Sequence, residues 1–179
     1  MLLLAAWCHP PAVLATAGLA EWEVRTPGTN VVCHSDPFIS THGTCLRPPD
    51  DKPGVATTET VYVSHIEWWQ YFKGFVVGKA KKGFFVFDEA SDKVTHHETE
   101  ALWQARLKEL SLDTPMTRRI LPADGWKLSW GPVLRSQMEQ RRKSDAYKAM
   151  SDAEKAAMEK QFEQLQEPDL RPVTPSAGS

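Results

Sequence analysis

The sequence Thr95-His96-His97-Glu98 combines side chains that can do chemistry with the spacing of a helix start. Thr95 as N-cap and Glu98 three residues later form a capping box, which predicts a helix over residues 96–110. The histidines then lie in the first helical turn, where free backbone N–H groups and the positive end of the helix dipole favour an anion. The same dipole favours neutral imidazoles. The motif therefore predicts a phosphate-binding turn, and two surface histidines on a capped helix are the simpler alternative.

Acidic residues on both sides of this motif predict a metal-assisted hydrolytic centre. Asp88 and Glu89 end the preceding apolar run, and Glu98 follows the histidines. Carboxylates disfavour a bound phosphate unless a divalent cation such as Mg²⁺ lies between them. We therefore expect Asp88 and Glu89 to hold the metal, and all three carboxylates to serve the attack of water on a phosphodiester bond. Arg106, inside the apolar arc of the predicted helix, either reaches the helix edge or projects toward this nucleotide site.

Basic residues occur in short runs, although the net charge of the chain is −2 and excludes a strongly basic nucleic-acid binder. One run is predicted at the tip of a β-hairpin, and another follows the predicted helix. The predicted contacts with a DNA backbone are Lys79, Lys81, Lys82, Arg118 and Arg119. For the lysines at the hairpin tip, the alternative is an ordinary solvated turn.

Cysteine and histidine occur together in a second cluster, Cys33-His34 and His42-x-x-Cys45. These ligand types suit zinc, although the spacing matches no common zinc finger. A nucleophilic cysteine with a histidine base is another alternative. The chain has three cysteines, and this odd number favours a reducing compartment. A disulfide between Cys33 and Cys45 is the remaining alternative, if the N-terminus is a secretory leader.

Apolar periodicity and turn residues predict the elements that position these groups. Before the predicted helix, the predictions are a strand–turn–strand over 22–32, an irregular loop over 35–60, a strand that becomes a short helix over 60–72, and a hairpin from 74–78 and 83–89. After it, they are a strand–turn–strand over 118–134 with its turn at Asp124-Gly125, and a helix from a capping box at 151–154 to about residue 166. Together they predict an α+β domain in which a small mixed sheet carries one central helix.

The same patterns divide the chain into four parts. They are an apolar N-terminal element over 1–21, a core over 22–134, a helical C-terminal arm over 135–167 and a disordered tail over 168–179. The N-terminal element has no basic residue before Arg25 and is interrupted by Pro10-Pro11, so we expect it to pack on the fold. Weak membrane association is the alternative. The predicted location is the cytoplasm, with the inner membrane as the place of any such association.

The stretch over residues 83–112 resembles the signature element of the ParB/sulfiredoxin-like fold family, in which a strand leads to G-[EHC]-[HR]-R-x-x-A and the motif holds nucleotide phosphates. The matching positions are Thr95 for the glycine, His96 and His97 for the two polar residues, and Ala101 for the alanine. Glu98 stands where the family has arginine, and Arg106, Arg118 and Arg119 are the candidates to replace it.

Four longer stretches resemble the plasmid fertility-inhibition family, whose activity is also described as oncogenic suppression. They are WEVRTPGTNVV, GTCLRPPD, HIEWWQYFKGFVVGKAKKGFFVFDEA and RRILPADGWKLSWGPVLR. The resemblance covers about residues 22–170. It implies a protein that blocks DNA transfer through a type IV secretion system, as an ATP-hydrolysing, ATP-regulated DNase that uses ATP and a divalent cation. The alternative is a non-catalytic inhibitor whose segment 66–72 and C-terminal helices bind a coupling protein or another secretion component.

Overall fold

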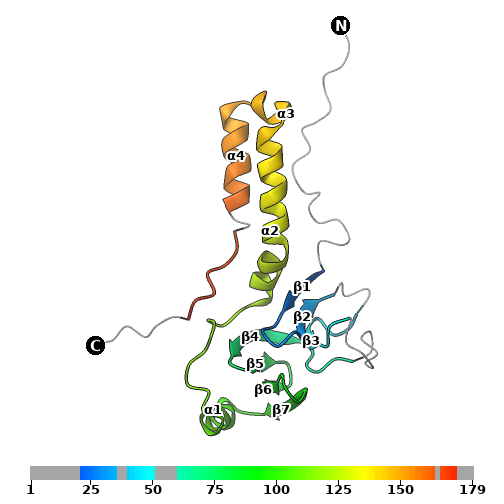
Figure 1. Ribbon diagram of the computed structural model, residues 1–179, viewed down its shortest axis with the longest axis vertical. Helices are drawn as coiled ribbons and strands as arrows, with labels where there is room; N and C mark the ends of the chain where they lie inside the picture. Colours follow the sequence, from blue (N-terminus) through cyan, green and yellow to red (C-terminus); the bar gives the residue numbers. More distant parts are fainter. Residues whose placement is uncertain (1–20, 36–39, 51–59, 164–165, 173–179) are drawn as a thin grey trace, which may run out of the picture.

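The computed structural model describes residues 21–35, 40–50, 60–163 and 166–172 (Figure 1). Several predicted segments lie partly outside the described residues. They are residues 1–20 of the N-terminal element predicted over 1–21, residues 36–39 and 51–59 of the predicted loop, and residues 173–179 of the tail. Two β-sheets form one end of the molecule, and a helical arm extends away from them (Figure 1).

Both sheets are antiparallel throughout. The first sheet contains β1 (Trp22–Arg25), β2 (Val31–His34) and β3 (Thr44–Arg47), and the second contains β4 (Ile66–Phe72), β5 (Phe75–Ala80), β6 (Gly83–Asp88) and β7 (Lys93–His97). The α+β class is confirmed, with two antiparallel sheets in place of one mixed sheet. The strand pair over 22–32 and the hairpin of β5 and β6 are also confirmed. Strand β3 lies where the sequence predicts only an irregular loop.

The main core lies between the two sheets and is rich in aromatic side chains. Trp69 on β4 is fully buried, and Trp22 on β1 stacks on it with 5.9 Å between ring centroids. Strand β4 continues as a strand to Phe72, so the predicted change to a short helix is wrong. Its residues alternate between this core, which holds Trp69, and a second cluster that holds Trp68. Burial of both faces favours a strand here.

Helix α1 (Glu100–Glu109) packs on the outer face of the second sheet. Its N-cap is Thr99, whose side chain accepts a hydrogen bond from the Leu102 backbone N at 3.3 Å. The predicted start at residue 96 is therefore wrong by one turn. The sequence predicts an apolar arc of Leu102, Trp103, Leu107 and Leu110 against the sheet. Burial is confirmed for Trp103 and Leu107, whereas Leu102 is 58% exposed.

Helix α2 (Pro122–Lys143) replaces the second strand–turn–strand of the prediction. Only Ile120, just before it, keeps a β-bridge, which it makes with Trp69. Pro122 occupies the first helical position, where its missing N–H costs nothing. The Asp124 carboxylate accepts a hydrogen bond from the Leu121 backbone N at 3.0 Å, which caps the start of the helix.

The arm consists of the far half of α2 with α3 (Asp145–Lys148) and α4 (Asp152–Glu163), and it points away from α1 (Figure 1). The capping box that opens α4 is confirmed, because Ser151 and Glu154 exchange backbone and side-chain hydrogen bonds at 2.8 and 3.3 Å. Glu159 of α4 receives hydrogen bonds from Arg142 and from Tyr147. Among the described residues, no helix is long and apolar enough to cross a bilayer.

Part of the predicted tail is packed on the core. Leu170 contacts the main hydrophobic cluster, and its backbone carbonyl accepts a hydrogen bond from the Arg118 backbone N at 2.9 Å. The Arg118 side chain donates to the Asp169 carbonyl at 2.8 Å. The chain after the arm therefore returns to the sheet end of the molecule.

Candidate functional site

The predicted phosphate-binding turn at Thr95–Glu98 does not begin a helix. Thr95, His96 and His97 belong to β7, where they pair with Val86, Phe85 and Phe84 of β6. The N-terminus of α1 therefore lies beyond them, and its first turn carries the acidic Glu100. The prediction of a phosphate at a helix N-terminus made by these residues is wrong. The half-buried His97 has a buried Nε2 without a hydrogen-bond partner among the described residues.

The predicted catalytic carboxylates are not gathered at one place. Asp88 pairs with Lys93 at one end of the β6–β7 hairpin, whereas Glu98 lies beside Gly83 at the other. Five residues of strand separate those ends by about 17 Å. Asp88 accepts hydrogen bonds from Ala90 N and Ser91 Oγ, and these bonds lower the pKa of its carboxyl. Among the described residues, no three His, Cys, Asp or Glu side chains are placed to hold a metal ion.

Glu89 joins the two sheets instead of facing a metal. Its carboxylate accepts a hydrogen bond from the Thr26 hydroxyl, and the Gly28 backbone N–H is shared between its two oxygens at 3.0 and 3.1 Å. Thr26 and Gly28 lie in the turn between β1 and β2, so this contact fixes that turn against the end of β6. The geometry gives Glu89 a structural role.

Glu89→Ala is expected to lower the free energy of unfolding by about 1–2 kcal/mol, because the hydrogen-bond donors of the β1–β2 turn lose their acceptor. Urea denaturation followed by circular dichroism measures this change. Glu98→Ala is the matched control, since Glu98 is exposed and its removal is expected to cost less than about 0.5 kcal/mol. Unchanged stability of Glu89→Ala would remove the structural role.

Two of the three arginines proposed to replace the missing motif arginine, Arg106 and Arg118, are bound within the fold. Arg106 forms an ion pair with Glu109 at 2.7 Å, one turn along α1. Arg118 donates to both carboxylate oxygens of Asp124 at 2.9 and 3.1 Å, and this interaction lowers the pKa of the half-buried Asp124 despite its burial. Arg118 therefore connects the start of α2 to the returning tail. Neither arginine lies on β7 beside the histidines.

The side chains of Lys79 and Arg119 contact two neighbouring residues of β4, Glu67 and Trp68. Lys79 is on β5, away from the hairpin tip, and pairs with Glu67 at 2.7 Å. The Arg119 guanidinium stacks on the Trp68 ring at 4.2 Å and is 53% exposed. Arg119 also forms an ion pair with Glu100 at 3.6 Å. Lys81 and Lys82, at the hairpin tip, are both exposed.

One small cavity brings together Lys82 and His96, which the sequence assigns to DNA and nucleotide binding. It has a volume of about 160 Å³ and is also lined by His42 and Ser64. Lys82 comes from the β5–β6 turn and His96 from β7, while His42 precedes β3 of the other sheet. Burial, followed by the positive charge of Lys82, lowers the pKa of His96, so its imidazole is neutral near pH 7. We refer to these lining residues as the His42–Lys82–His96 pocket.

The predicted zinc ligands divide between the two faces of the first sheet. Cys33 and Cys45 are opposite each other across β2 and β3, with 3.4 Å between their Sγ atoms. Successive strand residues face opposite sides, so His34 belongs to the other face. There it stacks on Trp22 with 6.0 Å between ring centroids and bonds to Thr44 Oγ1 at 3.1 Å. A zinc site that uses Cys33 and His34 together is therefore not formed.

Comparison with known proteins yields no match to a protein-family model, a curated protein or a solved structure. The candidate site therefore depends on geometry and on the sequence resemblance. Sequence reasoning missed His42 as a partner of His96, because residues far apart in the chain meet there. It also missed Arg47, which lies two residues after Cys45 and so on the same face of β3 as that cysteine.

Proposed function

We propose that the chain is a fertility-inhibition factor that blocks DNA transfer through a type IV secretion system, and that it binds phosphate groups in the His42–Lys82–His96 pocket. The observation that carries the proposal is the convergence of Lys82 and His96 in one cavity. The sequence resemblance supplies the biological context. DNA of the transferred strand and ATP are the ligands whose phosphates this pocket would take.

The chemistry of the pocket suits a phosphate oxygen. Lys82 supplies a full positive charge with three N–H donors, and a neutral His96 supplies one N–H donor. His42 and Ser64 add further polar groups from the opposite wall. Among the described residues, no carboxylate lines this cavity. A phosphate held here would lie between the two sheets, beside the exposed hairpin tip.

The pocket supports binding better than hydrolysis. Asp88 and Glu98 lie at opposite ends of one hairpin, and Glu89 holds the β1–β2 turn. The inhibitor would then act by occupying DNA or a coupling protein, with the projecting arm of α2 to α4 as the protein-binding surface (Figure 1). The ATP-dependent, Mg²⁺-requiring DNase that the resemblance implies is the second candidate. The position of His96 in the pocket and in the segment that resembles the nucleotide-binding motif favours this candidate. The DNase would need a set of metal ligands other than Asp88, Glu89 and Glu98, because these three do not lie at one place.

Lys82→Met is expected to weaken binding of a fluorescent thymidine oligomer about tenfold at low salt, because one phosphate contact is lost. The slope of log affinity against log salt concentration should also fall in magnitude by about 0.7. Fluorescence anisotropy measures both. Lys81→Met is the matched control, since Lys81 is the adjacent exposed lysine and does not line the pocket. Equal losses in the two variants would indicate a diffuse basic surface and contradict the pocket.

The same titration has a pH signature. A bound phosphate favours the imidazolium form of His96, so the affinity should rise as the pH falls from about 8 to about 6. A thymidine oligomer without terminal phosphate keeps a constant charge over this range. His96→Gln should bind with little pH dependence.

A transfer assay tests the inhibitor itself. In donor cells, Lys82→Met should restore the plasmid transfer that the wild-type protein blocks. Incubation of plasmid DNA with the protein, ATP and Mg²⁺ tests the DNase, the second candidate, directly.

A further inference from the structure

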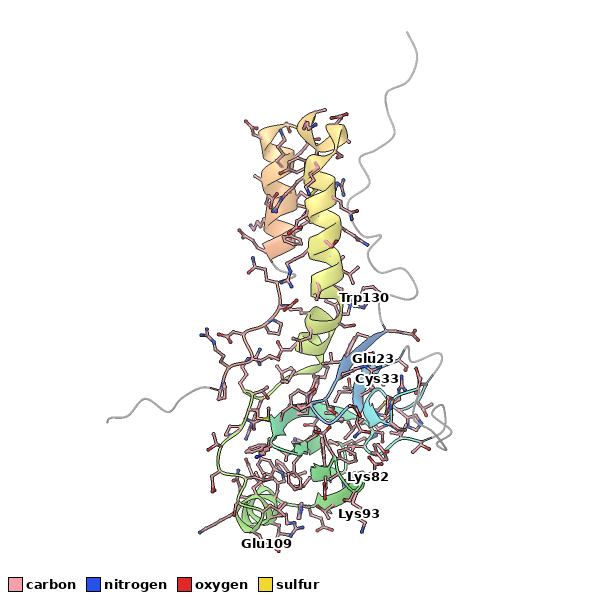
Figure 2. All side chains as sticks on the ribbon, viewed as in Figure 1. Glu23, Cys33, Lys82, Lys93, Glu109 and Trp130 are labelled. Atoms are coloured by element: carbon pink, nitrogen blue, oxygen red, sulfur yellow. The ribbon has the colours of Figure 1, made fainter. Side chains whose placement is uncertain are left out.

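The first sheet carries a pair of thiols that the phosphate pocket does not use. Cys33 on β2 and Cys45 on β3 are each about 95% buried, and their Sγ atoms are 3.4 Å apart. Figure 2 shows Cys33 next to Glu23, its pairing partner on β1, at the junction between this sheet and α2. The inference drawn from this pair does not rest on the proposed function.

The backbone places these two cysteines at a spacing that a disulfide can bridge. The backbone N–H and C=O of Leu46 both bond to Val63, on the outer side of β3. Because these groups alternate along a strand, those of Cys45 face β2, and Cys33 and Cys45 form a hydrogen-bonded pair. Such pairs have Cα atoms about 5.5 Å apart, within the range of natural disulfides. Only the two sulfur atoms need to approach each other.

The surroundings make the two thiols unequal. The hydrogen bond with Cys45 is the largest influence that lowers the pKa of Cys33 to about 7, against the effect of burial, and the next is a hydrogen bond from Arg47 Nε at 3.3 Å. The same cysteine hydrogen bond and burial raise the pKa of Cys45. Cys33 is thus the more acidic thiol of the pair. Arg47 is held in place by Glu23 at 2.9 Å and Asp50 at 2.6 Å.

A cavity lies beside one cysteine of the pair and not beside the other. It has a volume of about 360 Å³ and is lined by Cys33 and Arg47 on one side and by Ser129 and Trp130 of α2 on another. Cys45 does not line it. In Figure 2, Trp130 is labelled on the lower part of α2, above Glu23 and Cys33. Of the two cysteines, Cys33 is therefore the one that lies beside a small molecule in this cavity.

We propose that Cys33 and Cys45 form a thiol–disulfide exchange site for a low-molecular-weight disulfide, with Cys33 as the attacking sulfur and Cys45 as the resolving one. The Cys33 thiolate attacks one sulfur of R–S–S–R, which forms a mixed disulfide and releases R–S⁻ to take up a proton. Cys45 then loses its proton and attacks the Cys33 sulfur, which releases the second R–S⁻. The two protein thiols are oxidised to one disulfide, and the small disulfide is reduced to two thiols.

The lowered pKa of Cys33 raises its thiolate fraction at neutral pH above that of an ordinary thiol, and this increase outweighs the smaller fall in the nucleophilicity of the sulfur.

The test treats the full chain with oxidised glutathione, alkylates the remaining thiols and maps the peptides by mass spectrometry. In the wild type, Cys33 and Cys45 are expected in one disulfide-linked pair of peptides. In Cys45→Ser, the mixed disulfide is expected to stop on Cys33, whose peptide gains one glutathione. Cys33→Ser should leave Cys45 reduced, because Cys45 does not face the cavity. Cys8, outside the described residues, is mapped separately on its own peptide.

Arg47→Gln tests whether the positive charge of Arg47 lowers the pKa of Cys33. The measured quantity is the pH midpoint of Cys33 alkylation, which a purely structural role of Arg47 would not change. The pH midpoint of Cys33 alkylation should rise in this variant, and remain unchanged in the control Arg25→Gln, from the same face of the same sheet. Circular dichroism confirms that both variants are folded. The proposal is overturned if Cys33 in the folded wild type resists glutathione disulfide, or if Cys45→Ser accumulates no mixed disulfide on Cys33. Neither outcome affects phosphate binding at the His42–Lys82–His96 pocket.

Discussion

Trp103→Ala is expected to lower the free energy of unfolding by about 3–5 kcal/mol, the range for loss of a buried aromatic side chain. Trp103 is 2% exposed and is the main contact of α1 with the second sheet. Its ring stacks on Phe84 at 5.3 Å and meets Trp68 edge-on at 5.7 Å. Its Nε1 donates to the Phe85 carbonyl at 3.2 Å. The substitution therefore removes packing and leaves a buried carbonyl with one acceptor site unused.

Urea denaturation measures this loss, and two variants make it specific. Leu102→Ala is the matched control, because Leu102 is adjacent and 58% exposed, so its removal should cost less than about 0.5 kcal/mol. Trp103→Phe retains an aromatic ring and should fall between the two. If Trp103→Ala were no more destabilising than Leu102→Ala, α1 would not be held on the sheet by this side chain, and the sheet would not need α1 for stability.

Elements that depend on local contacts are the ones that the sequence predicts well. The β5–β6 hairpin is two apolar runs around the turn at Lys81 and Lys82, and its partners are adjacent in the chain. Helix α4 begins at a capping box whose members, Ser151 and Glu154, are three residues apart. Both signals are complete within one short segment. No distant residue is needed to decide between alternatives, which is why these two predictions are confirmed.

The start of α1 shows how a distant partner decides between equal local signals. Thr95 and Thr99 can both cap a helix, and the capping-box spacing favours Thr95. Strand β6 decides the matter, because without β7 its backbone N–H and C=O groups would form an unpaired edge. Pairing Thr95 with Val86 satisfies those groups and moves the helix start to Thr99. The misplaced phosphate site follows from this one-turn difference.

Helix α2 was missed although its sequence carries helical signals. Pro122 is typical of a first helical position, and apolar residues recur every four positions at Trp126, Trp130, Leu134 and Met138. Asp124-Gly125 is a strong turn signal and favours the wrong interpretation. Glycine is tolerated here because of what lies beside it, the Trp22 ring of β1. That contact spans about a hundred residues of chain and has no local signature.

One half of the candidate pocket depends on local contacts and the other half on distant ones. Lys82 and His96 come together because β5, β6 and β7 are consecutive antiparallel strands, a neighbourhood that the hairpin pattern makes predictable. His42 belongs to the segment before β3 of the other sheet. That sheet is joined to the segment before β4 by a β-bridge between Leu46 and Val63. The sequence therefore predicts that Lys82 and His96 are close together. The position of His42 depends on how the two sheets pack, which the sequence does not indicate.

Gly125→Val is expected to destabilise the protein by about 3 kcal/mol, because it overpacks the contact between α2 and β1. A Cβ at this position would lie 2.4 Å from Cη2 and 2.5 Å from Cζ3 of Trp22. The Trp22 ring has little freedom to move, since it stacks on Trp69 on one side and on His34 on another. Valine forms a helix slightly better than glycine does, by a few tenths of a kcal/mol, so this gain does not offset the clash.

Ala123→Val is the matched control, because Ala123 is exposed in the same helical turn and the change should cost about 0.5 kcal/mol by helix propensity alone. Urea denaturation of both variants separates the clash from the propensity, and equal losses would contradict a tight α2–β1 contact. The consequence extends to function. Trp22 also lines the cavity beside Cys33, and α2 is the base of the projecting arm. A displaced Trp22 should therefore change the alkylation rate of Cys33 together with stability, which Ala123→Val should not do.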